Sequence, residues 1–153
     1  MLELLKGFNF KSEIVYGGVD GLITTFAIIA GSVGANFSNK VIIVLGIASI
    51  IVDGFSMGIS SFLAEKIKDQ RKHPLIVGIS TFLAFIFIGC LPLIPFIFEI
   101  NYAFIISTII LLIILFILGY LKGDIKNAAE TVLVGGIGVF ISYYVASFIK
   151  KFV

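Results

Sequence analysis

Five long apolar stretches constrain the fold of this chain more than any other feature of its sequence. Each is about twenty residues long, the length that an α-helix needs to cross roughly 30 Å of hydrocarbon. We therefore expect transmembrane helices near residues 14–34, 41–64, 75–98, 102–121 and 128–149. The composition agrees with a membrane protein, because 13% of the residues are charged, whereas about 25% of the residues of a soluble domain are charged. The predicted fold class is an all-α integral membrane protein, a bundle of five transmembrane helices that forms one domain over residues 1–153.

Proline and polar residues mark the ends of the predicted helices. Pro74 suits the first turn of the third helix, where its missing N–H leaves no hydrogen bond unmade. Pro92 and Pro95 should kink or end that helix on its far side. Asn127, with Glu130 three residues later, resembles a capping pair for the fifth helix. The connections between the helices are therefore expected to be short.

Basic residues predict the orientation of the bundle, because cytoplasmic loops of membrane proteins are enriched in Lys and Arg. With a cytoplasmic N-terminus, the inner side carries eight basic residues and the outer side three. The inner set is Lys6, Lys11, Lys66, Lys68, Arg71, Lys72, Lys122 and Lys126, and the outer set is Lys40, Lys150 and Lys151. We expect the N-terminus and a loop at residues 65–74 in the cytoplasm, and the C-terminus outside.

Composition also excludes several kinds of site and partner. The single cysteine, Cys90, excludes an internal disulfide and a cysteine-based metal cluster. A net charge of +2 is too small to suggest a nucleic-acid partner. We expect no resident cofactor.

Two carboxylates lie deep within apolar helices, Asp20 in the first and Asp53 in the second. A charge at membrane depth costs at least a few kcal/mol and by default marks an ion or proton pathway. Residues four apart share a helix face, which places Thr24 with Asp20 on a stripe that also holds Glu13 and Gly17. The second stripe holds Ser49, Asp53, Met57 and either Ser60 or Ser61. Polar stripes must face protein or water rather than lipid, so the two helices should share a polar seam.

The side chains of this seam narrow the choice of ion. Carboxylate and hydroxyl oxygens suit hard ions, whereas a thioether favours softer transition metals such as Fe²⁺. We expect Asp20 and Met57 to bind the metal directly, with Asp53 as a second ligand or a proton carrier, since desolvation raises the pKa of a carboxyl group. Three hydroxyl side chains would add further oxygens: Thr24, Ser49 and Ser56.

Three other carboxylates are candidates for ion access. Glu13 and Glu130 lie at the inner starts of helices, where they would either cap the helix through its dipole or admit ions. Glu65 and His73 fall in the basic loop. This loop is either a solvated segment that sets the orientation of the protein or a site that collects metal.

Several motifs resemble the vacuolar iron transporter family. They are Val19-Asp20-Gly21-Leu22-Ile23-Thr24 with Ala30-Gly31, then Ser56-Met57-Gly58, and less specifically Gly119-Tyr120-Leu121-Lys122, Glu130 and Gly135-Gly136. The resemblance implies a five-span homodimer that moves Fe²⁺, and often Mn²⁺, out of the cytoplasm in exchange for protons. It also implies that Asp20 and Met57 line the path, at the dimer interface.

The sequence departs from that family pattern in two ways. Ser61 stands where a Glu is common in the family, and Ser49 stands at a second position that is acidic in the family. Asp53 is therefore a candidate to replace one of these missing carboxylates. A long Glu-rich cytoplasmic segment that gathers metal in many members has no counterpart, because residues 65–73 are too few to hold it. A short member of this kind favours a prokaryotic cell membrane over a vacuolar-type organelle membrane.

Other functions are compatible with buried carboxylates. A proton-coupled exporter of small molecules would use one titrating carboxylate, and a membrane scaffold would transport nothing. An intramembrane aspartyl protease would use Asp20 and Asp53 as a dyad, but neither residue stands in a Gly-x-Gly-Asp motif. The sequence therefore predicts a transporter and not an enzyme.

Overall fold

Helices, and no strands, make up the regular structure of residues 9–68 and 73–152, the part of the chain that the computed structural model describes. The elements are α2 (Lys11–Gly34), α3 (Asn39–Ile67), α4 (Pro74–Gly89), the 3₁₀ turn η1 (Leu91–Leu93), α5 (Ile94–Ile97), α6 (Ala103–Lys122) and α7 (Ile125–Ile149). Five stretches are long and apolar enough to cross a membrane, with α4, η1 and α5 together forming the third, Pro74–Ile97. Each predicted boundary lies within three residues of the observed one, so the predicted all-α membrane fold is confirmed. Lys6, Arg71 and Lys72, used to predict orientation, lie outside the described residues.

Proline and one carboxylate explain where several helices begin and end. Pro74 occupies the first turn of α4 as predicted, and the third span breaks after Gly89, with Pro92 in η1 and Pro95 in α5. The predicted cap of the last helix is wrong, because Asp124 is the N-cap residue and its carboxylate accepts a hydrogen bond of 2.9 Å from the Asn127 N–H. That bond lowers the pKa of Asp124 below its ordinary value.

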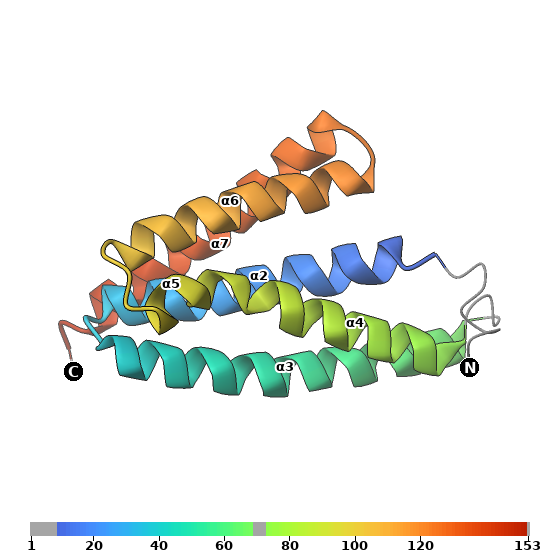
Figure 1. Ribbon diagram of the computed structural model, residues 1–153, viewed down its shortest axis with the longest axis horizontal. Helices are drawn as coiled ribbons and strands as arrows, with labels where there is room; N and C mark the ends of the chain where they lie inside the picture. The colour runs from blue at the N-terminus through green and yellow to red at the C-terminus, as the bar shows by residue number, and fades with distance from the viewer. Residues whose placement is uncertain (1–8, 69–72, 153) are drawn as a thin grey trace.

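Helix α2 lies at the centre of the bundle (Figure 1). It packs against α3, α4, α6 and α7, and α4 in turn packs along α3. Leu22, Phe26 and Ile29 of α2 are fully buried and form the core together with Leu111 and Leu115 of α6. The α6–α7 pair and the α3–α4 pair therefore lie on different sides of α2, which leaves α2 to join the two halves of the fold.

Two close approaches between backbones hold α4 against its neighbours. A Cβ added to Gly21 would lie 2.5 Å from the Phe85 carbonyl oxygen, and one added to Gly78 would lie 2.8 Å from the Gly58 carbonyl oxygen. Both separations are too short for a side chain, so glycine is required at each crossing. Such contacts replace the hydrophobic effect as a packing force between helices in lipid.

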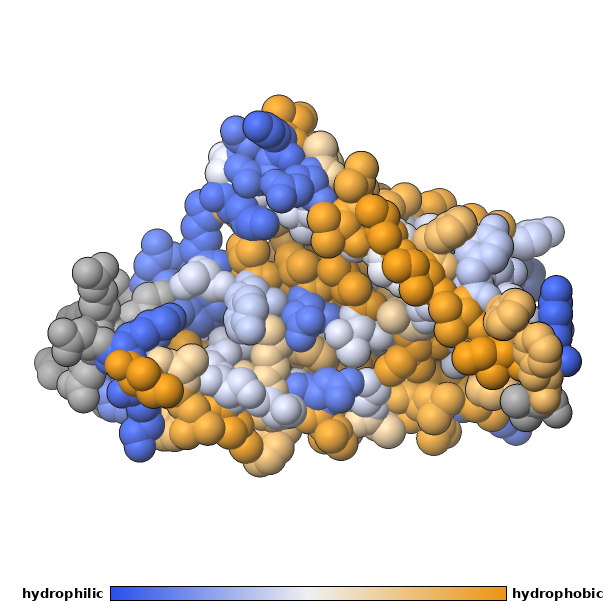
Figure 2. All heavy atoms as spheres, turned by 180° about the vertical axis from the view of Figure 1, so that it is seen from behind, coloured by the Kyte–Doolittle hydropathy of each residue, from blue (hydrophilic) through white to orange (hydrophobic). Residues whose placement is uncertain are grey.

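The outer surface is apolar but is interrupted by polar side chains. Helix α7 buries only Ala128, Thr131 and Gly135. In the most apolar part of each helix, 6% of the α7 residues are buried, against 44% of the α2 residues. The rear face of the molecule nevertheless carries hydrophilic side chains in its middle, bordered by hydrophobic surface (Figure 2). Polar groups at this depth need water or protein as a neighbour.

Candidate functional site: two carboxylates and two cavities

The structure brings together the carboxylates of the first two spans. Asp20 is exposed on α2 and Asp53 is half-buried on α3, and the two charges are close enough to repel each other. Ser49, one turn before Asp53, donates a hydrogen bond from its hydroxyl to the Asp53 carboxylate. α2 and α3 thus present a pair of anionic groups, one of them oriented by a hydroxyl, in a part of the chain that is otherwise apolar.

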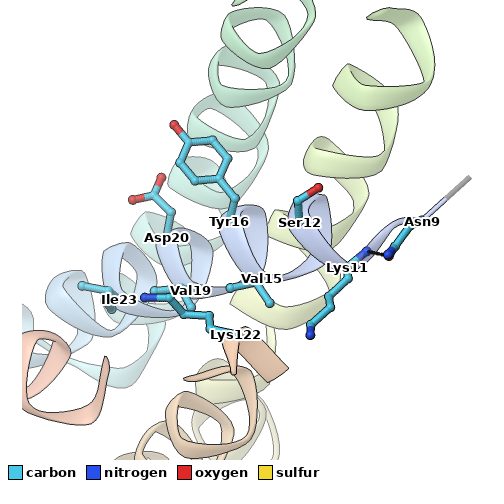
Figure 3. A pocket seen from close by; sticks show the side chains of 9 residues that line it. All are labelled: Asn9, Lys11, Ser12, Val15, Tyr16, Val19, Asp20, Ile23 and Lys122. Carbon is cyan, nitrogen blue, oxygen red and sulfur yellow. Dashed lines mark hydrogen bonds between the residues drawn. The ribbon is translucent and has the colours of Figure 1, made fainter. Parts of the chain in front are cut away.

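Asp20 lines a cavity of about 820 Å³ that is open at the surface. Figure 3 shows the Asp20 carboxylate and the Tyr16 ring on the same side of α2, as expected for residues four apart, while Lys122 reaches the cavity from the end of α6. The lining residues are Asn9, Lys11, Ser12, Val15, Tyr16, Val19, Asp20, Ile23 and Lys122. An exposed carboxylate cannot face hydrocarbon, so this cavity must be filled by water or covered by another protein surface.

The remaining predicted ligands, on the same two helices, differ in burial and surroundings. Met57, four residues after Asp53, has 9% of its surface exposed, and the following Gly58 packs against Phe82 of α4. Ser56 is exposed and Thr24 is half-buried, and Thr24 lines a further cavity of about 810 Å³ between α2 and α7. Within residues 9–68 and 73–152, no three His, Cys, Asp or Glu side chains form a group that could hold a metal. Two carboxylates of one chain therefore do not make a complete coordination shell without sulfur, hydroxyl or outside ligands.

The predicted polar stripe of α2 is split between two environments. Gly17 is buried against α4, where an added Cβ would lie 2.5 Å from the Thr81 carbonyl oxygen. Glu13 has 5% of its surface exposed and lines a second cavity, whereas Asp20 lies in the first. Spacing alone placed all of these residues on one face, but the packing of α4 against α2 divides that face.

A second cavity of about 910 Å³ lies where α2 begins and α3 ends. Its lining residues are Ser12, Glu13, Tyr16, Ser60, Ser61, Ala64, Glu65, Lys68, Val77 and Thr81. Glu65 was expected in a loop, and that expectation is wrong: α3 continues to Ile67, and Glu65 is 6% exposed. The signal for this was its position four residues after Ser61, which continues the polar side of α3 by one turn.

The last two residues named for ion access or metal collection lie at the surface. Glu130 is exposed near the start of α7 and lines none of these three cavities. His73 is the N-cap residue of α4 and is also exposed. The structure therefore gathers Glu13 and Glu65 around one cavity and leaves Glu130 apart from them.

Comparison with known proteins gives matches along most of the chain. A sequence profile described as the VIT family matches residues 11–71 and 65–147. The chain is 36% identical over 56 residues to a vacuolar iron transporter of Toxoplasma gondii, which covers 37% of this chain and 18% of that protein. It is 37% identical over 59 residues to vacuolar iron transporter 1 of Arabidopsis thaliana, covering 39% and 24%, and 43% identical over 54 residues to a vacuolar iron transporter of Centaurea cyanus, covering 35% and 22%. The matched part thus spans less than a quarter of each of these relatives. All three names are those of transporters, in agreement with the prediction that the chain is not an enzyme.

Proposed function

The chain belongs to the VIT family, and from this premise we propose that it transports divalent transition metals, Fe²⁺ and Mn²⁺, out of the cytoplasm in exchange for protons. The observation that carries the proposal is the pair of carboxylates, Asp20 and Asp53, that two apolar spans hold close together. Intramembrane carboxylates are expensive and mark ion paths. The relatives named as iron transporters support iron as one substrate.

In this proposal Asp20 and Met57 bind the metal directly, and Asp53 is a second ligand. Its hydrogen bond from Ser49 holds the Asp53 carboxylate in one orientation, which favours coordination. Ser49, Ser56 and Thr24 supply further oxygens. The Met57 thioether favours Fe²⁺ over harder ions such as Mg²⁺ and Ca²⁺.

The same pair of carboxylates accounts for the exchange with protons. Two negative charges within two apolar spans repel each other, so the site favours the arrival of positive charge, whether a metal ion or a proton. Metal and proton then compete for Asp20 and Asp53. A proton gradient across the membrane would drive the metal in the opposite direction.

We further propose that the protein works as a homodimer in which a second copy covers the Asp20 cavity. The cavity is open at the surface of the chain, and its carboxylate cannot face lipid. A two-fold axis beside this cavity would bring the same groups from both copies to one place. That arrangement would supply the additional ligands that two carboxylates of a single chain lack.

The orientation follows from the basic residues, with the N-terminus in the cytoplasm and the C-terminus outside. Lys11, Lys66 and Lys68 are exposed at the end of the bundle where α2 begins and α3 ends, and we take this end as cytoplasmic. The membrane is either a prokaryotic cell membrane, favoured by the short connection between α3 and α4, or a vacuolar-type organelle membrane. Lipid and protons are the other partners that the proposal requires.

The function is tested by uptake into proteoliposomes across an imposed pH gradient, with Fe²⁺, Mn²⁺, Co²⁺, Zn²⁺ and Ca²⁺ offered separately. The proposal predicts uptake of Fe²⁺ and Mn²⁺ that stops when the pH gradient is collapsed. Proton-dependent movement of an organic cation without any metal uptake would instead support the small-molecule exporter. A scaffold would move neither.

A further inference from the structure

The cavity of about 810 Å³ between α2 and α7 is a mostly apolar groove that is open at the surface, here called the α2–α7 groove. One side of it is formed by lining residues within 23–35, from α2 and the turn that follows, and the other by lining residues within 142–150 of α7. The two helices end at the same end of the bundle (Figure 1), where the Ser147 hydroxyl donates a hydrogen bond of 3.3 Å to the Gly34 carbonyl oxygen. The groove therefore runs lengthwise between two parallel helices toward that end.

Small side chains leave the groove hollow. Ala27, Gly31 and Ala35 line it at intervals of four residues, the spacing that places residues on one side of a helix. A Cβ added to Gly31 would lie 3.1 Å from the Ser142 hydroxyl oxygen and 3.8 Å from the Ala146 Cβ. The Ser142 hydroxyl is already bonded, because it donates to the Ala27 carbonyl oxygen. The two helices thus meet through small residues, and their surfaces offer an occupant mainly apolar contacts.

The groove has the position and the length that suit a lipid acyl chain. Both helices are long and apolar enough to cross a membrane, so the open side of the groove faces hydrocarbon. Residues 23–35 rise by about 18 Å along the helix axis, and one leaflet contributes about half of a hydrocarbon core of roughly 30 Å. Apolar walls without a neighbour lose their dispersion contacts. An acyl chain of one leaflet would restore those contacts along the whole groove.

The charge at the end of the groove indicates the headgroup. Lys150 is the C-cap residue of α7, is exposed, and is the only charged residue that lines the groove. Within residues 9–68 and 73–152 it has no ion-pair partner. A lysine at the membrane surface attracts anionic headgroups, and its aliphatic stem can lie along apolar walls. Charge therefore favours a lipid with a net negative headgroup over a zwitterionic one.

The same charge makes a second copy of the chain a poor occupant of this groove. In a two-fold dimer with its axis along the membrane normal, each residue and its counterpart lie at the same depth. A contact across the groove would bring two Lys150 ammonium groups together, and no acidic side chain lines the groove to neutralise them. Ile23 lines both this groove and the Asp20 cavity. A lipid in the groove would thus lie beside the surface proposed for the homodimer.

We propose that the α2–α7 groove binds an anionic glycerophospholipid, with one acyl chain between α2 and α7 and the headgroup phosphate beside Lys150. The proposal is independent of the proposed transport, because neither Asp20, Asp53 nor Met57 lines the groove. Lipid binding is therefore measurable whether or not the protein moves metal.

The test counts lipids bound to the purified full-length protein by native mass spectrometry. The probes are phosphatidylglycerol and phosphatidylcholine with identical acyl chains. Wild type should bind phosphatidylglycerol about fivefold more tightly, the preference expected for one lysine near an anionic surface, and Lys150→Gln should bring this preference close to one. Lys151→Gln is the matched control, since it removes the same charge from an exposed neighbour that does not line the groove. A wild-type preference in Lys150→Gln, or an equal loss in both variants, overturns the proposal.

A second pair of variants tests the acyl chain. Ala27→Leu fills part of the groove and should lower the binding of both lipids, whereas Gly136→Leu, at a position of α7 with open space around it, should bind both as wild type does. Thermal unfolding should show a higher Tm with phosphatidylglycerol and no change with glycerol phosphate, which lacks acyl chains. An equal rise with glycerol phosphate would mean that the site holds a free phosphate and overturns the lipid. Conversion of a dimer to a monomer by Ala27→Leu, measured by light scattering, would assign the groove to a second copy and also overturn it.

Discussion

The carboxylate of Asp20 on α2 lies close enough to that of Asp53 on α3 for the two charges to repel each other. Both lie in helices that are long and apolar enough to cross a membrane. Evolution of a purely structural bundle would not be expected to retain this unfavourable pair. A positive charge shared by the two side chains converts the repulsion into binding, and this is the physical basis of the proposed transport.

Removal of the Ser49 hydroxyl should weaken metal binding without removing a carboxylate. Ser49 donates its hydrogen bond to Asp53, so Ser49→Ala frees that carboxylate to rotate. Loss of a group that orients a ligand typically costs 10–100-fold in metal affinity or activity, and we expect about tenfold for Mn²⁺ uptake. Thr108→Ala is the matched control, because the Thr108 hydroxyl bonds to the Phe104 carbonyl within α6. Equal uptake by the two variants would contradict the role of Ser49.

Replacement of the Met57 sulfur should change which metal is preferred more than it changes stability. Met57→Leu conserves volume in a buried position, and such swaps usually cost less than about 1.5 kcal/mol. We expect Fe²⁺ uptake to fall relative to Mn²⁺ uptake, since the thioether favours the softer ion. Competition between the two metals in proteoliposomes measures the ratio. Ile50→Leu on the same buried side of α3 should leave that ratio unchanged. An unchanged ratio in Met57→Leu would show that the Met57 sulfur does not bind the metal.

The glycine crossings predict a large difference between two identical substitutions. In Gly21→Ala the new Cβ would lie 2.5 Å from the Phe85 carbonyl oxygen, whereas Gly136 has open space around it. Overpacking of this kind costs about 1–3 kcal/mol, while alanine in an open helical position gains up to about 1 kcal/mol over glycine. Thermal unfolding in detergent should show a lower Tm for Gly21→Ala and an equal or higher Tm for Gly136→Ala. The reverse order would contradict the close packing of α2 on α4.

The cap of α7 predicts a pH-dependent contribution to stability. Hydrogen bonds from Asn127 lower the pKa of Asp124 from its ordinary value of 3.8 in the folded protein. A lowered pKa stabilises the fold at pH values above 3.8, and this stabilisation is lost as the pH falls through the folded-state pKa. The difference in Tm between wild type and Asp124→Ala should therefore be constant near neutral pH and shrink in acid. Asp124→Asn, which keeps an N-cap side chain, should lose less stability at neutral pH than Asp124→Ala.

The helices could be predicted from the sequence because their apolar stretches match the membrane thickness and because Pro74 and Pro95 mark real boundaries. The prediction of Glu65 in a loop is wrong because α3 continues beyond the apolar stretch into residues that are polar by composition. The start of α7 was missed for a related reason. Asp124 caps the helix before the apolar stretch begins, whereas the apolar pattern points to Asn127, three residues later.

The site was only partly predictable for a different reason. Helical spacing correctly paired Ser49 with Asp53, because that contact lies within one helix. Spacing also placed Gly17 on the side of Asp20, but Gly17 is buried against α4. The side of α2 that is buried depends on where α4 crosses it. That crossing is set by tertiary packing and cannot be predicted from the helical spacing of residues within α2.

Uptake of Mn²⁺ by Asp20→Asn, Asp53→Asn and the double variant tests the central claim most directly, with Glu99→Gln, an exposed carboxylate between α5 and α6, as the control. If the two carboxylates share one ion, each single variant should lose nearly all pH-driven uptake and the double variant should lose little more, because residues of one site are not additive. Glu99→Gln should transport as wild type does. Uptake by Asp20→Asn at the wild-type rate would contradict the account.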